Sequence, residues 1–282
     1  MSVTTSKKET LSYKASPLPF MGQKRNFSKK FMDELGKMPN DLIIIDLFGG
    51  SGILSHSAKV AKPDCRVIYN DFDNFQLRLK SIQVTNDLIA FARSILSEYP
   101  RNNRVPEEPK KQILKRIKQA QSDHGYIDYI SLSSSFLFSG KYALSYDELA
   151  KEGWYNKVRR SDFKADGYLD GVELVCFDYR DLYNQFKDVE GVVFIIDPPY
   201  LQTQSTTYKE HWNLGQHLDT LTVLQSEKFF YFTSSKSNII ELMDWLDSHA
   251  FMPSPFKYCK RLSHKQMVSG LNSYEDIMFV KG

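Results

Sequence analysis

The stretch Asp197-Pro198-Pro199-Tyr200 combines residue types that could act together on one substrate. It follows the apolar run VVFII (192–196), and in an open parallel sheet ligands bind beyond the carboxyl ends of the strands. Each proline fixes φ and offers a carbonyl without an N–H, and the residue before a proline is held extended. We therefore expect Asp197 and the Pro198 carbonyl to form a stiff row of acceptors beside the Tyr200 ring. A row of acceptors beside an aromatic ring suits a planar substrate that carries an NH2 group. The alternative interpretation is that the prolines simply end the strand and that Asp197 is an exposed acid.

A second candidate site is the glycine-rich stretch DLFGGSG (46–52). Glycines between a strand and a helix let the backbone approach a ligand, and the helix N-terminus offers free N–H groups and a positive dipole end. This suits a nucleotide-like ligand, although strand-to-helix turns also use glycine for steric reasons alone. The spacing departs from the G-x-G-x-x-G dinucleotide fingerprint. Asp71 ends the next apolar run, roughly 20 residues on, where α/β nucleotide folds bind ribose hydroxyls; a surface carboxylate is the other interpretation.

A parallel sheet would bring these residues together, and the hydrophobic pattern predicts one. Apolar runs separated by helical patterns are typical of α/β folds, and two later runs predict a C-terminal hairpin. The middle of the chain lacks such runs and mixes Lys and Arg with aromatic residues. We expect an α/β domain of residues 17–75 and 171–282, an insertion at 76–170 and a flexible arm at 1–16. The strand-like runs lie at 42–46, 65–71, 172–178, 191–197, 228–235, 255–263 and 274–282.

Composition narrows the class of protein further. A chain of 282 residues, with 41% hydrophobic and 13% aromatic residues, can bury a full core and is not typical of disorder. The net charge of +3 permits an anionic partner without requiring one. The three cysteines fit a reduced compartment, and no stretch resembles a signal peptide or membrane span, so we expect a cytoplasmic protein. The six histidines show no ligand spacing, so no metal is expected.

Taken in order, the motifs resemble those of the Dam-type DNA adenine-N6 methyltransferases, which use S-adenosylmethionine. PFMGQK (19–24) is similar to the family's N-terminal cofactor motif, with Phe20 where tryptophan is frequent and Gln23 in place of a second glycine. DLFGGSG is similar to its F-x-G-x-G cofactor loop, and DPPY is its catalytic tetrapeptide. FDYRD (177–181) is similar to its adenine-contacting acid–aromatic pair; Asp178 matches the family's register, and Asp181 remains the other choice.

The resemblance implies a Rossmann-like methyltransferase sheet, mostly parallel with a C-terminal antiparallel hairpin, and a mainly helical DNA-recognition insertion. It implies S-adenosyl-L-methionine as cofactor and double-stranded DNA as partner, in a bacterial or phage-infected cell. YNKVRRSDF (155–163) resembles the region where the family places a DNA-contacting hairpin. The implied catalytic residues are Asp197, Pro198, Pro199 and Tyr200; the cofactor-binding residues are Phe20, Gly22, Lys24, Asp46, Phe48, Gly49, Gly50, Gly52, Asp71, Asp178 and Tyr179; the DNA-binding residues are Asn156, Lys157, Arg159 and Arg160.

The leading hypothesis is a site-specific DNA-methyltransferase (adenine-specific) that methylates N6 of a flipped-out adenine, with a GATC-like site as the first to test. Because the tetrapeptide selects a planar amine, RNA adenine or cytosine N4 are alternative targets. A catalytically inactive DNA-binding protein is the alternative of another class. A nicotinamide oxidoreductase is disfavoured by the incomplete fingerprint. The polar residues 201–208 are either a lid over the base or a surface loop.

Overall fold

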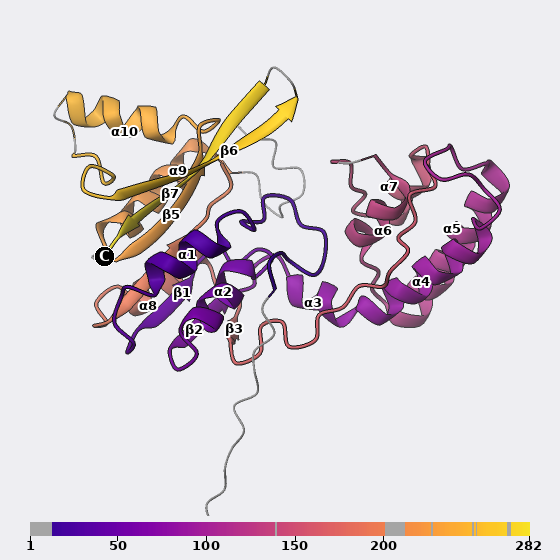
Figure 1. Ribbon diagram of the computed structural model, residues 1–282, viewed down its shortest axis with the longest axis horizontal. Coiled ribbons are helices and arrows are strands. Elements are labelled where there is room, and N and C mark those ends of the chain that lie inside the picture. Colours follow the sequence, from indigo (N-terminus) through magenta and orange to yellow (C-terminus); the bar gives the residue numbers. More distant parts are fainter. Residues whose placement is uncertain are drawn as a thin grey trace, which may run out of the picture. The chain divides into compact units, whose positions relative to one another are not determined.

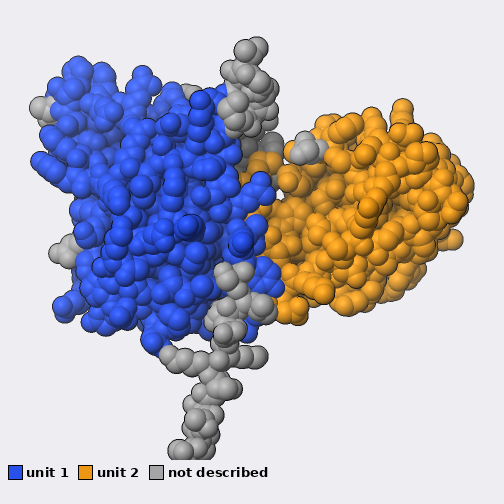
Figure 2. All heavy atoms as spheres, viewed as in Figure 1, with its two compact units in different colours: residues 1–15, 24–73, 167–282 blue, residues 16–23, 74–166 orange. Residues whose placement is uncertain are grey.

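The structure, a computed structural model (Figure 1), describes residues 13–138, 140–200, 212–226, 228–249, 251, 253–269 and 272–282. Most of the expected arm at 1–16 and all of segment 201–208 lie outside the described residues. Two compact units make up the chain (Figure 2): unit 1 contains 1–15, 24–73 and 167–282, and unit 2 contains 16–23 and 74–166. Residues 16–23 thus group with unit 2, although the sequence placed 17–75 in the α/β domain. Among the described residues, no helix has the length and apolar character needed to span a membrane.

Within the described residues, unit 1 is built on a seven-stranded sheet of order β3-β2-β1-β4-β5-β7-β6 (Figure 1). Neighbours from β3 to β5 pair in parallel, whereas β7 pairs antiparallel with both β5 and β6. The expected mostly parallel sheet with a C-terminal antiparallel hairpin is therefore confirmed. The strands are β1 (Ile43–Asp46), β2 (Arg66–Asn70), β3 (Glu173–Val175), β4 (Val192–Ile196), β5 (Phe229–Ser234), β6 (Lys260–Ser269) and β7 (Asn272–Lys281).

The strand order reverses between β1 and β4, because the chain runs outward from β1 to β2 and β3 and then returns to β4 and β5. In open α/β sheets, ligands bind at this switch point, beyond the carboxyl ends of the strands. In the β1–β4 register Asp46 pairs with Ile195, so the ends of the two strands are level. The glycine-rich stretch and the DPPY tetrapeptide follow these two neighbouring strands and are therefore placed at the switch point.

Buried side chains cover both faces of the sheet in unit 1, which explains the continuous apolar runs. On one face Phe194, Phe229 and Tyr231 belong to a buried cluster with residues of α8, η1 and α10. On the other face Phe31 of α1 packs edge-on against Phe230, with ring centroids 4.7 Å apart. The helices of this unit are α1 (Ser28–Leu35), α2 (Ile53–Ala61), α8 (Tyr179–Phe186), α9 (Leu214–Asp219), the 3-10 helix η1 (Thr220–Gln225) and α10 (Ile239–Ser248).

Unit 2 consists mainly of helices in its described part. The longest, α5, buries Ile113, Ile117 and Ala120 along one stripe, as an amphipathic helix should. A buried ion pair between Arg78 and Asp128, with Nε 3.1 Å from Oδ1, joins α3 to the start of α6, and Arg78 also donates to a carbonyl of segment 16–23. The helices are α3 (Phe75–Lys80), α4 (Ile82–Ile95), α5 (Glu107–His124), α6 (Tyr129–Phe136) and α7 (Tyr146–Lys151).

Two of the expected strands differ in extent from the apolar runs that predict them. The run at 255–263 becomes a strand only from Lys260, because residues 255–258 form turns in which Lys257 and Cys259 donate backward along the chain. The run at 172–178 is strand only over Glu173–Val175. Its later part diverges because the backbone N–H and C=O of Phe177 bind the Asn70 side chain instead of a neighbouring strand.

Candidate active site

Asp197 follows β4 directly and is held by a cation. Its Oδ2 lies 2.6 Å from Nζ of Lys24, and the side chains of the two residues are only 17% and 8% exposed. Its Oδ1 is buried and has no hydrogen-bond partner among the described residues. Burial raises the pKa of Asp197 above its usual value, whereas the ammonium of Lys24 works in the opposite direction. The result is a carboxylate with one oxygen engaged and one oxygen available as an acceptor.

Lys24 contacts the Tyr200 ring as well as this carboxylate. Nζ of Lys24 is 5.1 Å from the centroid of the Tyr200 ring, a cation–π distance. The resemblance assigns Lys24 to the cofactor motif; the structure shows it paired with the acid of the tetrapeptide. Pro198 is buried and Pro199 half-buried, so the segment that carries Asp197 is packed as well as stiff. The four DPPY residues and Lys24 therefore form one local cluster.

The glycine turn after β1 is shaped by close contacts. A Cβ on Gly49 would lie 2.7 Å from the Asn70 carbonyl oxygen and closer still to the Tyr69 ring, so a side chain is excluded there. Gly50 and Gly52 have φ of 51° and 74°, a region that favours glycine. Gly52 is the N-cap of α2, whose first N–H groups therefore lie at the turn. The backbone of this turn therefore has no room for a side chain at Gly49.

Asp71 lies beside the glycine turn, as expected. The Tyr69 hydroxyl is 2.8 Å from the carbonyl oxygen of Gly50 and 3.2 Å from Oδ1 of Asp71, and the Asp71 side chain is buried. Asn70, which is not among the predicted site residues, links the neighbouring strand ends. Its amide nitrogen donates to the carbonyls of Leu47 and Phe177, and its oxygen accepts from the N–H of Phe177. An asparagine inside an apolar strand run was the signal that could have identified it.

Asp46 is the most deeply buried acid of the site. Ser55 Oγ donates to its Oδ2 at 2.6 Å. Burial raises the pKa of Asp46 to about 7, with a further contribution from the negative charge of Asp197. Burial therefore favours the protonated form of Asp46 more strongly than that of an exposed aspartate. The glycine turn and the tetrapeptide are thus electrostatically coupled through two carboxylates at adjacent strand ends.

Asp178 caps a helix and binds an arginine. Its Oδ1 accepts from the backbone N–H of Arg180 at the start of α8, and the guanidinium of Arg180 binds both carboxylate oxygens at 2.9 and 2.8 Å. This contact lowers the pKa of Asp178. Asp181, the alternative acid, is exposed in the first turn of α8. The helix cap gives Asp178 a fixed position that Asp181 lacks.

Tyr179 and Phe48 form an aromatic wall next to the glycine turn. Their ring centroids are 4.8 Å apart, and Trp212 contacts both rings. Burial raises the pKa of Tyr179 to about 12, so its hydroxyl stays protonated at neutral pH. Trp212 lies outside the motifs that the sequence displays. The detectable signal was the N-x-x-Q pattern that follows it, which forms a capping box at the start of α9.

Some predicted residues lie in unit 2. Phe20 packs edge-on against Phe75, and Gly22 has a φ of 80°; their expected cofactor contacts stay predictions. Asn156 is buried, and its amide nitrogen donates to the carbonyls of residues 96 and 99, so in this structure it fixes the backbone. Lys157 and Arg159 alternate with buried residues along residues 154–159 and share a partly exposed face.

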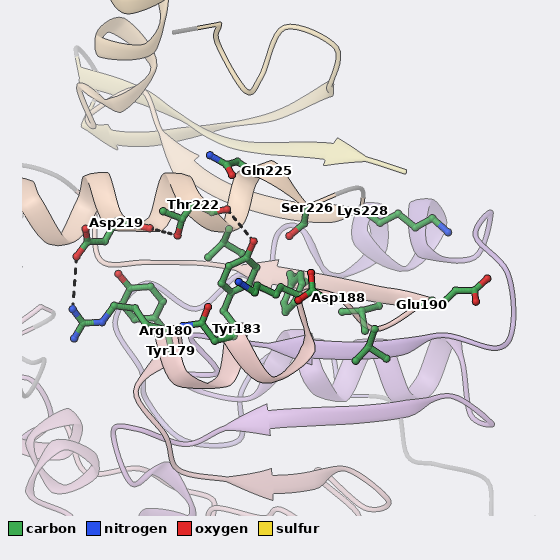
Figure 3. Close-up of a pocket in the computed structure, with 17 residues that line it drawn as sticks. Tyr179, Arg180, Tyr183, Asp188, Glu190, Asp219, Thr222, Gln225, Ser226 and Lys228 are labelled. Atoms are coloured by element: carbon green, nitrogen blue, oxygen red, sulfur yellow. Dashed lines mark hydrogen bonds and ion pairs between the residues drawn. The ribbon is translucent and has the colours of Figure 1, made fainter. Parts of the chain in front are cut away.

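A groove of about 1150 Å³ lies between α8 and η1 in unit 1 (Figure 3). Tyr183 reaches across it and donates to the carbonyl of Thr222, and Arg180 extends toward Asp219. Tyr179 and Arg180 belong to its lining, but Asp197 and the glycine turn do not. The groove therefore adjoins the aromatic wall and does not contain the tetrapeptide.

The chain is similar to known methyltransferases. The family model for D12 class N6 adenine-specific DNA methyltransferases matches residues 20–268, which include parts of both units. A protein from Haemophilus influenzae named "Putative methyltransferase" is 36% identical over 279 residues, which cover 96% of this chain and 93% of that one.

Among solved structures, a precorrin-6y C5,15-methyltransferase from Geobacter metallireducens superposes with a TM-score of 0.37 and 11% identity over 97% of this chain and 98% of that chain, a similarity too low to support any conclusion. The family match covers most of the chain and contains both the glycine turn and the tetrapeptide. The chain thus belongs to the D12 class N6 adenine-specific DNA methyltransferase family.

Proposed function

We propose that this methyltransferase transfers a methyl group from S-adenosylmethionine to N6 of an adenine at a specific site in duplex DNA. The observation that carries the proposal is the state of Asp197. One of its oxygens binds Lys24, while the other is buried, unpartnered among the described residues and at the switch point of the sheet. The DNA substrate also makes the cytoplasm of a bacterial or phage-infected cell the expected location.

The residues at the glycine turn fit an adenosyl cofactor. Gly49 leaves a cradle that a Cβ would fill, and the buried Asp71 carboxylate stands beside it. The first N–H groups of α2 can receive a carboxylate, since helix N-termini bind anions. When bound, S-adenosylmethionine supplies a methyl group on a positively charged sulfur, which is a good leaving group. The chain has to hold and orient the accepting amine.

Asp197 and Pro198 can perform this orientation. An adenine amine is a poor nucleophile because its lone pair is delocalised into the ring. If Oδ1 of Asp197 and the Pro198 carbonyl accept its two N–H groups, the nitrogen is held near tetrahedral geometry with its lone pair directed at the methyl group. Orientation of this kind can lower a barrier by on the order of 7–11 kcal/mol. Lys24 supports the step by opposing the protonation of Asp197.

Tyr200 completes the proposed substrate site. A duplex hides adenine N6 in the base stack, so the base has to be flipped out at a cost of a few kcal/mol. Stacking on an aromatic ring recovers roughly 1–3 kcal/mol per base. In this structure the Lys24 ammonium lies over the Tyr200 ring. The arriving base would take over this face, and we expect Lys24 to stay with Oδ2 of Asp197.

The proposal is tested by labelled methyl transfer to duplex DNA and to RNA, followed by nucleoside analysis. We expect N6-methyladenine in DNA, made by the native chain and lost by at least about 100-fold in Asp197→Ala, which should still bind S-adenosylmethionine. Asp181→Ala, an exposed acid of α8, is the matched control and should keep its activity. N4-methylcytosine as the sole product, transfer to RNA alone, or an active Asp197→Ala variant would each contradict the proposal.

A further inference from the structure

Three aromatic rings from distant parts of the chain meet next to the glycine turn. Phe48 belongs to the turn after β1, Tyr179 is the first residue of α8, and Trp212 precedes α9. The Trp212 ring centroid lies 5.5 Å from that of Phe48 and 5.7 Å from that of Tyr179, and it stacks on Tyr179 at an interplanar angle of 30°. The three rings therefore form a closed cluster at the carboxyl edge of the sheet.

The position of Trp212 is set by the start of α9. Asn213 and Gln216 form a capping box, in which each side chain accepts from the backbone N–H of the other. Trp212 precedes the cap, and its ring contacts His217 in the first turns of the helix, with centroids 5.3 Å apart. This is the arrangement of a hydrophobic staple, which fixes the direction of the chain entering a helix. The ring is thus placed by local structure against the other two.

Phe48 and Tyr179 are held more firmly than Trp212. Both pack against the buried core cluster of unit 1, and within the described residues Trp212 is not part of that cluster. The Asn70 side chain also holds the backbone one residue before Phe48, at Leu47, and two residues before Tyr179, at Phe177. Trp212 is half-exposed. If one ring is to move, it is therefore Trp212.

The spacing shows that one ring has to move for a flat ligand to enter. A purine between two aromatic faces needs about 7 Å, roughly 3.5 Å on each side. The observed centroid separations of 4.8 to 5.7 Å are those of direct ring contact. The three rings themselves carry no charge, since burial keeps Tyr179 protonated by raising its pKa, and burial also lowers the pKa of the neighbouring His217; the guanidinium of Arg180 lies 5.8 Å from the Tyr179 ring centroid. A neutral planar ligand fits this cluster better than a charged one.

We infer that Trp212 is a purine-stacking residue of the cofactor site, and that its ring occupies part of the purine position until the cofactor displaces it. This inference rests on the proposed function, because it names the part of S-adenosylmethionine that the cluster receives. Phe48 and Tyr179 stay in place on one side of the bound purine. Trp212 moves away to admit the purine and then stacks on its other face.

Tryptophan fluorescence provides the direct test in the full chain. Of the three tryptophans, Trp154 is buried in unit 2 and Trp245 lies on α10 against His249. We expect S-adenosylhomocysteine to change the emission of the native chain and of Trp245→Phe, and to leave that of Trp212→Phe unchanged. A change that persists in Trp212→Phe would overturn the inference.

Affinity measured by calorimetry separates the inference from the proposed function. We expect Trp212→Ala to weaken S-adenosylhomocysteine and adenosine by the same factor of about ten, because the loss is at the purine, while Trp212→Phe stays within about threefold. Thermal unfolding of both variants checks that they fold. Equal affinity of Trp212→Ala and the native chain would overturn the inference and leave the function standing. If the native chain binds neither S-adenosylmethionine nor its product, the proposed function itself is wrong.

Discussion

In the proposed mechanism, Asp197 acts as a hydrogen-bond acceptor although it is largely removed from water. Burial favours the protonated form of a carboxyl group, and a cation in contact favours the ionised form. Both effects act on Asp197, where burial is the larger and Lys24 opposes it. Asp276 and Asp197 repel each other as well. Lys24 is thus a positioning residue whose effect should be visible in the pH dependence of the reaction.

Lys24→Met keeps the length of the side chain and removes its charge. Because Lys24 lowers the pKa of Asp197, its loss raises that pKa further, and the carboxylate is then protonated at a higher pH. We expect the acid limb of the kcat/KM profile to move to higher pH, with activity recovering toward the native level on the alkaline side. Lys24→Arg, which keeps the cation, should stay close to the native profile. Identical profiles for Lys24→Met and the native chain would show that Lys24 does not support the ionised acid.

At the scale of elements, the site depends on strand ends that are held together. The Asn70 side chain joins the end of β1 to the segment after β3 through three hydrogen bonds. The Asn70 side chain and its bond to the Leu47 carbonyl are buried, whereas the two bonds to Phe177 are partly buried. The segments that carry Phe48 and Asp178 begin directly after the two carbonyls that Asn70 holds. One side chain therefore aligns the glycine turn with the helix cap of α8.

Asn70→Ala should lower both stability and cofactor affinity. Its removal leaves the buried carbonyl of Leu47 without a donor, which costs about 1–3 kcal/mol of unfolding free energy, while water can reach the partly buried groups of Phe177. Urea unfolding monitored by circular dichroism measures this loss. Asn184→Ala, at an exposed position of α8, is the control and should change stability by less than about 0.5 kcal/mol. Equal stabilities of the two variants would refute the clamp.

At the scale of the whole molecule, the small net charge of +3 means that attraction to DNA has to come from local groups. In unit 2 Lys157 and Arg159 share the partly exposed face of residues 154–159, next to the exposed Arg160. Lys157 lies over the ring of Phe138, which is 54% exposed. Cations beside exposed aromatic rings suit phosphate and base contacts. Because Asn156 is engaged with the backbone, the DNA proposal rests on the three cations.

The combined variant Lys157→Ala, Arg159→Ala and Arg160→Ala should weaken DNA binding similarly for all sequences. Each lost phosphate contact lowers the slope of log affinity against log salt by about one, so we expect the slope to fall by about two to three. Fluorescence anisotropy with a labelled duplex at several salt concentrations measures it. Lys115→Ala, Arg116→Ala and Lys118→Ala on the solvent face of α5 form the control set. A larger effect in the control set would move the DNA surface to α5.

Local pattern was enough to predict most of the sheet. Apolar runs of strand length, helical stretches between them and a late hairpin predicted the mostly parallel topology, since burial on both faces demands apolar strands. The tetrapeptide and the glycine turn could be located because proline and glycine set the local backbone conformation, and both motifs consist of adjacent residues. The prediction failed where a side chain from elsewhere competes for the backbone, as at Phe177, which Asn70 removes from the expected strand.

The sequence by itself determined where strands follow one another along the chain, the acid and two prolines after β4 and the family, because each depends on neighbouring residues or on ordered motifs. Only the tertiary structure paired Lys24 with Asp197, buried Asn156 and brought Trp212 against Phe48 and Tyr179. These contacts join residues far apart along the chain. They depend on which strands become neighbours and on how much water remains around each side chain, and neither property is local to the sequence.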